Sequence, residues 1–211
     1  MTCSRRSAAS AALALFAVLG ILGLAGQDRE PPRRDPLKAD ADQMAAKIAR
    51  IQAIAQSPAE PGRAPARTVL TEAEINAYLF WNGDEVLPIG LTDPRIRLAG
   101  DGHVSANAVV DLTAIRNQRE RGWLDPLAYV GGQMPVVASG VVRTRDGLAT
   151  IELGTVTIGG VEVPRSVLQE LVSYYTRSAE SPGGVSLDAP IAMPAAIREV
   201  TVGKGEAVVI Q

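Results

Sequence analysis

The fold class follows from RIRLAGDGHVSANAVVDL, the stretch at residues 95–112. Ile96 and Leu98 alternate with arginines before a Gly-Asp-Gly turn at 100–102. After the turn, apolar side chains return at every second position from Val104 to Leu112. Because successive side chains of a strand point to opposite faces of a sheet, this period of two predicts a β-hairpin with one apolar face.

Two further hairpins are predicted along the chain. The second joins residues 136–143 to 148–158 through a turn at Asp146-Gly147. The apolar parity changes within its second strand, which predicts a β-bulge near Gly154. The third, at residues 197–210, turns at a Gly-Lys-Gly sequence. The hairpins have no fixed sequence period, so they indicate an antiparallel sheet and not a repeat protein.

Two helices are predicted beside these hairpins. The first lies within residues 68–81. Thr71 is its predicted N-cap, Glu74 completes the spacing of a capping box, and Asn82-Gly83 predicts the helix end. The second follows Pro164, and its apolar face comprises Val167, Leu168, Leu171, Val172 and Tyr175. The sequence therefore predicts an α+β domain, a curved antiparallel sheet of hairpins packed with two helices.

The N-terminal segment, residues 1–26, predicts either a signal peptide or a transmembrane anchor. Arg5 and Arg6 precede a run of 19 residues, 8–26, in which Ser10 is the only polar side chain. Small residues at Gly23 and Ala25 are compatible with cleavage after Ala25. A spanning helix needs about 17–25 residues, so the length of the run favours an uncleaved anchor. Either form places the protein in the cell envelope: membrane-anchored with the domain outside the cytoplasm, or secreted or periplasmic after cleavage.

Residues 27–67 form a predicted linker that contains one helix. Proline-rich stretches at 27–38 and 57–67 flank a segment, 39–56, whose apolar residues Met44 and Ile48 begin a helical stripe. This helix could pack on the main domain or extend from the membrane as a stalk. The extracytoplasmic domain itself is predicted over residues 68–211.

Composition and motifs favour a protein without catalytic residues. A net charge of −2 gives no basic footprint for nucleic acid, and one His and one Cys cannot form a zinc site from nitrogen and sulfur ligands alone. The sequence contains neither a G-x-S-x-G elbow nor a phosphate-binding G-x-x-x-x-G-K-[ST] loop. His103 is interpreted as a turn residue, and Asp111, Glu152 and Glu162 as members of a solvated sheet face. We therefore expect no catalytic residue, no metal and no cofactor.

Apolar surface is the remaining candidate for function. One face of the sheet carries small and branched residues such as Ala106 and Ala108, which could hold a helix or leave a groove for a lipid chain. An exposed apolar patch, in the loop with Trp123 and Tyr129, is the alternative expectation for an interaction module.

Three segments carry a resemblance to a known family: LTEAEINAYL (70–79), GTVTIGGVEVPRSVLQELVSYY (154–175) and LDAPIAMPAAIREVTVGKGEAVV (187–209). Together they resemble the YpmS-like group of small membrane-anchored bacterial envelope proteins and, more loosely, the LmeA-type envelope proteins. The resemblance implies an N-terminal anchor, an extracytoplasmic domain similar to tubular lipid-binding folds, and an apolar ligand. It transfers no catalytic residue. The long linker at 27–67 departs from the family pattern.

The sequence thus predicts a non-enzymatic envelope protein that binds a lipid or another apolar ligand. The alternative is a membrane-tethered structural or interaction module of an envelope complex, with a protein partner there. The predicted ligand-binding residues lie on the two helices: Tyr78, Leu79 and Trp81 on the first, and Leu168, Leu171, Val172 and Tyr175 on the second.

Overall fold

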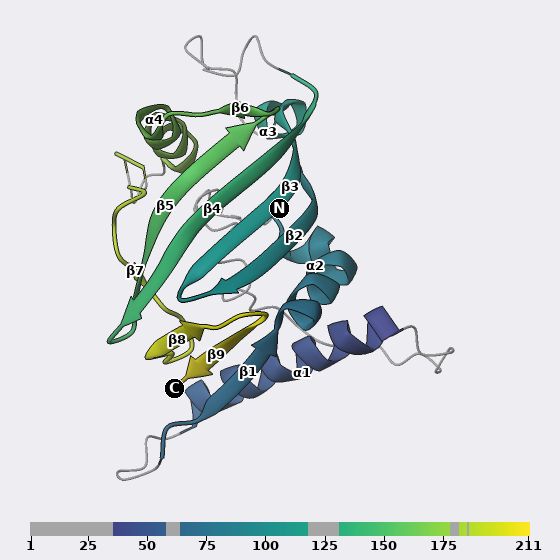
Figure 1. Ribbon diagram of the computed structural model, residues 1–211, viewed down its shortest axis with the longest axis vertical. Helices are drawn as coiled ribbons and strands as arrows, with labels where there is room; N and C mark the ends of the chain where they lie inside the picture. Colours follow the sequence, from purple (N-terminus) through teal and green to yellow (C-terminus); the bar gives the residue numbers. More distant parts are fainter. Residues whose placement is uncertain (1–35, 58–63, 118–130, 178–181, 185) are drawn as a thin grey trace, which may run out of the picture.

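Two antiparallel sheets form the frame of the computed structural model, which describes residues 36–57, 64–117, 131–177, 182–184 and 186–211 (Figure 1). The elements are α1 (Pro36–Gln56), β1 (Arg67–Thr71), α2 (Glu72–Val86), β2 (Leu91–Gly100), β3 (His103–Asp111), α3 (Leu112–Asn117), β4 (Gln133–Arg145), β5 (Leu148–Ile158), β6 (Val161–Glu162), α4 (Arg165–Thr176), β7 (Ile191–Ala192), β8 (Glu199–Val202) and β9 (Glu206–Ile210). The six-stranded sheet has the order β2-β3-β4-β5-β6, with β7 paired to β5. The three-stranded sheet has the order β1-β9-β8. The predicted α+β class is confirmed.

The first two predicted hairpins are β2-β3 and β4-β5, and both lie in the six-stranded sheet. The predicted bulge is confirmed, because Ala138 pairs with Val156 and Gly140 with Leu153, which leaves Gly154 and Thr155 opposite Ser139. A Cβ on Gly154 would lie 3.2 Å from the carbonyl oxygen of Ser139. Glycine therefore lets the bulged strand approach its partner closely.

The third hairpin, β8-β9, is not part of the large sheet. Strand β1 pairs antiparallel with β9, from Arg67 opposite Ile210 to Thr71 opposite Glu206. The sequence analysis placed the helix N-cap at Thr71 and predicted no strand before it, so β1 was missed. Residues 67–71 have alternating burial over only five positions, so the strand depends on its distant partner rather than on a long local pattern.

Helix α2 begins as predicted and ends later than predicted. Thr71 is the N-cap, and both bonds of the capping box with Glu74 are present. The predicted stop at Asn82-Gly83 is wrong, because the Asn82 side chain donates to the carbonyl of Tyr78 (3.1 Å) and the helix continues to Val86. Leu87 ends it in an extended conformation, φ −85° and ψ 149°, as the residue before a proline favours.

Helix α1 packs on α2 and is part of the core, so of the two alternatives for this helix the structure shows the packed one (Figure 1). It begins at Pro36, three residues before the predicted start. Met44 is 0% exposed and Ile51 6% exposed, and both belong to the same buried cluster as α2 and the two sheets. Gln211, directly after the last strand, donates from Nε2 to the carbonyl of Ile51 (2.8 Å). The folded unit therefore includes α1 in addition to residues 68–211.

Polar side chains of α2 cover the outer edge of β2. The Asn76 amide accepts from the Ile96 N–H (2.7 Å) and donates to the Ile96 carbonyl (2.8 Å). Glu72 accepts from the Leu98 N–H (2.8 Å). These bonds occupy backbone groups that an edge strand would otherwise offer to another chain. They also fix the N-terminal half of α2 beside the second half of β2.

No helix within the described ranges is long and apolar enough to cross a membrane. The apolar run at 8–26 lies outside those ranges.

Candidate functional site

A pocket of about 210 Å³ lies between the C-terminal half of α2 and the start of β2. Its apolar wall comes from Leu79, Leu87 and Leu91 with the two aromatic rings that follow Leu79 in α2. The complete lining is Leu79, Phe80, Trp81, Gly83, Asp84, Leu87, Leu91, Thr92, Asp93, Pro94 and Arg95. The last turns of α2, together with Leu87 directly after the helix, therefore form one wall of this pocket.

A β-bulge in β2 forms the other wall. Thr92 pairs with Val109 but Arg95 pairs with Asn107, so β2 has one more residue than β3 over this interval. Asp93 has a left-handed backbone, φ +50°, which aspartate tolerates better than most residues. Pro94 follows it and has no N–H to offer the sheet. The bulge takes Asp93 and Pro94 out of the regular ladder and places them at the pocket.

Two aromatic rings are exposed at the pocket. Phe80 is 58% exposed and Trp81 46% exposed. Their rings contact edge to face, with centroids 5.7 Å apart and an interplanar angle of 88°. The Lys38 ammonium of α1 lies 5.9 Å from the Trp81 ring centroid. Because water contact with large aromatic rings is unfavourable, this exposed pair is the candidate for an apolar contact surface.

The polar groups of the pocket have mixed charge. Asp84, Asp93 and Arg95 lie on its lining, with Thr92 as a further hydrogen-bonding group. Behind them, burial and the nearby charge of Glu85 raise the pKa of Tyr78, which therefore stays a neutral phenol at pH 7. Across the described residues, no three His, Cys, Asp or Glu side chains group in a way that could hold a metal. The pocket lining thus combines apolar side chains with polar and charged groups of both signs.

The predicted ligand-binding residues fall in three places. Leu79 and Trp81 line the pocket, and Tyr78 is buried in the core behind it. Leu168, Leu171 and Val172 are half-buried on α4. Tyr175 belongs to α4, but its side chain lies outside the described residues.

The structure does not bring the two predicted helices into one groove. Helix α2 contacts β2 at one edge of the large sheet, whereas α4 lies beside β5 and β6 at the other edge (Figure 1). Arg165 at the start of α4 donates to the carbonyl of Leu153 in β5 (3.3 Å), and the Val163 N–H donates to Val156 (2.9 Å). Sequence periodicity identified two apolar helix faces but gave no information on their separation.

Several lining residues were missed by sequence reasoning. Leu87, Leu91 and the bulge residues Asp93 and Pro94 were not predicted as part of any site. Among these four residues, only Pro94 gave an indication in the sequence, because a proline next to a predicted strand marks an edge strand or a β-bulge. Leu87 and Leu91 gave none, because only the packing of α2 against β2 brings them together.

The strand carboxylates do not form a catalytic pair. Asp111 accepts from the Ala114 N–H (2.9 Å) and so caps the short helix α3. Glu152 forms an exposed ion pair with Arg143 (2.6 Å), whose hydrogen bond lowers the pKa of Glu152. Glu152 lies opposite Val141, which pairs with His103 at the far end of β3 from Asp111. His103 and Asp111 are eight residue steps apart along β3, so Glu152 and Asp111 are separated by about 26 Å along the strand direction, at 3.3 Å per residue.

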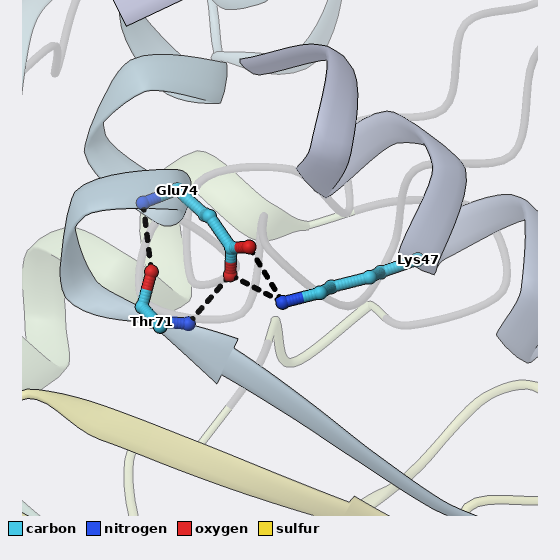
Figure 2. Close-up of polar contacts among 3 residues, drawn as sticks. All are labelled: Lys47, Thr71 and Glu74. Atoms are coloured by element: carbon cyan, nitrogen blue, oxygen red, sulfur yellow. Dashed lines mark hydrogen bonds and ion pairs between the residues drawn. The ribbon is translucent and has the colours of Figure 1, made fainter. Parts of the chain in front are cut away.

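Among the residues that the structure describes, the most buried ion pair joins α1 to α2 (Figure 2). The Glu74 carboxylate accepts from Lys47 Nζ at 2.6 Å on each oxygen and from the Thr71 N–H at 2.8 Å. Burial raises the pKa of Glu74, but the bonds from Lys47 and Thr71 and the Lys47 charge outweigh it, so the net pKa lies below its ordinary 4.5. The carboxylate is occupied by these donors, and the pair holds the two helices together.

Comparison with family models, curated proteins and solved structures finds no match to this chain. The resemblance to the YpmS-like group therefore stays a prediction from the three quoted segments.

Proposed function

We propose that this chain is a non-enzymatic cell-envelope protein whose folded domain binds a lipid or another amphipathic molecule at the pocket between α2 and β2. In this proposal residues 8–26 hold the protein at a membrane or direct its export, with the domain outside the cytoplasm. The observation that supports ligand binding is the pocket itself, with exposed Phe80 and Trp81 on its lining.

The size and lining of the pocket favour part of a larger molecule. Ligand pockets commonly measure about 300–1,000 Å³, and this one is smaller, at about 210 Å³. An apolar segment would contact Leu79 and Leu91, while a polar group at the mouth would meet Thr92 and Arg95. Asp84 and Asp93 disfavour a multiply charged anion there, so the proposal favours a zwitterionic or neutral head group.

The test is mass spectrometry of lipid that stays with the released domain. The full chain, with a protease site introduced within residues 27–35, is extracted from native membranes and cleaved, and residues 36–211 are analysed. We expect a stoichiometric lipid, reduced about tenfold by Trp81→Ser, since a buried ring contributes about 1.5–3 kcal/mol.

Val167→Ser is the matched control. Val167 is 43% exposed on α4, close to the 46% of Trp81, and lies at the other edge of the sheet. We expect this variant to retain the lipid. A released domain without any lipid would contradict the proposal, and loss of lipid on Val167→Ser alone would move the site to α4.

A membrane-tethered interaction module is the second candidate. The exposure of Phe80 and Trp81 also suits a protein interface, because aromatic residues are enriched at the centres of such interfaces. A lipid-free domain, together with an envelope protein crosslinked through position 81, would favour this reading over the first.

A further inference from the structure

The first turn of α1 lies beside the exposed aromatic pair. Lys38, three residues into α1 counting from Pro36, places its ammonium 5.9 Å from the Trp81 ring centroid. Lys38 also pairs with Asp42 one turn later in α1. The chain therefore enters the folded domain at the surface where Phe80 and Trp81 are exposed.

The distance from the apolar N-terminal run to this surface is bounded by the chain length. Nine residues, 27–35, separate Gly26 from Pro36. A fully extended chain spans at most about 3.6 Å per residue, which gives about 32 Å. If residues 8–26 lie in a membrane, the aromatic pair is tethered close to that membrane.

We infer that Phe80 and Trp81 dock on the lipid surface of the membrane that holds residues 8–26, with their rings at the boundary between head groups and acyl chains. This inference rests on the anchored form of the proposed function. Tryptophan prefers this boundary because its ring is apolar and its N–H is polar. Lys38 can extend its ammonium to the head groups from the same surface. Two weak attachments in one chain reinforce each other, since the second becomes intramolecular.

The charges around the pair indicate how it docks. Asp84 and Asp93 lie on the same pocket lining as the rings and offset the positive charge of Lys38 and Arg95. The surface therefore has no net attraction for anionic lipids, and ring insertion supplies the binding. Docking then depends little on salt or on the fraction of anionic lipid. It also places the pocket, which the same rings line, next to the bilayer.

The experiment measures quenching of Trp81 by brominated acyl chains. The sequence has two tryptophans, so Trp123→Phe leaves Trp81 as the reporter. The full chain is reconstituted into phosphatidylcholine vesicles with and without bromine on the acyl chains. We expect the Trp81 emission to fall about twofold or more in brominated vesicles, as for a ring at the membrane interface. Phe80→Ser in the same background should reduce that quenching.

A matched control reports from the other edge of the sheet. Val161→Trp, in a Trp81→Phe, Trp123→Phe background, places the reporter on β6 at a position that is 69% exposed. We expect no quenching there. Should the tryptophan variants fail to fold, the unaltered chain is photo-crosslinked with a diazirine phosphatidylcholine and its labelled peptides are mapped. Labels are then expected within 79–89 and absent from 161–170.

Each outcome decides the inference separately from the proposed function. Unquenched Trp81, or labels elsewhere on the domain, overturns docking even when the released domain retains lipid. A blue-shifted but unquenched Trp81 also overturns it and indicates a protein cover, either a partner or a second copy. Quenched Trp81 with a lipid-free released domain supports docking while ligand binding in the pocket fails.

Discussion

Lys47→Met should destabilise the domain more than its surface position suggests, because it leaves Glu74 charged and buried. The Glu74 side chain is 6% exposed and accepts two bonds from Lys47, while its third donor is the Thr71 N–H (Figure 2). Removing one partner of a buried pair costs about 3–5 kcal/mol. Lys47 is 29% exposed, so water can replace part of what is lost. We therefore expect the free energy of unfolding to fall by about 2–4 kcal/mol.

The pH dependence of this variant has a definite sign. The folded-state pKa of Glu74 lies below its ordinary 4.5, so the unfolded chain binds more protons near that pH. The contribution of the pair is therefore complete above pH 4.5 and is lost as the pH falls through the lower, folded-state pKa. Lys47→Met should weaken this dependence, because only the Thr71 bonds then lower the pKa of Glu74, so the difference between variant and wild type should shrink below pH 4.5.

The assay is urea unfolding of residues 36–211 followed by circular dichroism, at pH 7 and at steps below pH 4.5. Lys38→Met is the matched control in the same helix, because its pair with Asp42 is exposed on both sides, at 50% and 64%. We expect that control to change stability by less than about 0.5 kcal/mol. If Lys47→Met costs no more than Lys38→Met at pH 7, the reasoning on Glu74 is refuted.

Three further predictions concern the core and the sheet edge. Asn76→Ala leaves the Ile96 N–H and carbonyl without their amide partner and should lower the free energy of unfolding in urea by about 2–3 kcal/mol. Dimerisation through the uncovered β2 edge should rise in light scattering, and unchanged stability would contradict the edge-covering role. Met44→Ala removes a side chain that is 0% exposed and should cost about 2–4 kcal/mol; a loss below 1 kcal/mol would mean that α1 packs loosely. Residues 68–211 expressed without α1 should bind a hydrophobic dye and unfold without a sharp transition, while residues 36–211 unfold cooperatively in the same thermal scan.

The local features of the fold were predictable from sequence. The two main hairpins, the bulge at Gly154 and the capping box at Thr71 depend on residues within a few positions of one another. Each was therefore visible as a short pattern of apolar parity, turn glycine or cap spacing. The end of α2 was not predictable in this way, because Asn82 and Gly83 are common at helix ends yet lie within this helix. The restriction that Pro88 places on Leu87 decides where the helix ends.

The candidate site was predicted only in part. The sequence identified Leu79 and Trp81 as apolar residues of a helix, and both line the pocket. Placing Leu168 and Leu171 in the same groove would have required the order of the strands. That order sets the two helices at opposite edges of the sheet. Helical periodicity gives the apolar face of each helix but not which sheet edge the helix covers.

By itself the sequence determined the fold class, the turns and the helix start, together with the prediction of an envelope location from residues 8–26. Their physical basis is local: side-chain parity, backbone freedom at glycine and hydrogen bonding across three or four residues. Only the tertiary structure decided that α1 belongs to the core, that β1 pairs with β9, and that Lys47 binds Glu74. Those contacts join residues 27 to 160 positions apart, and they form because burying apolar surface favours arrangements in which buried polar groups find partners.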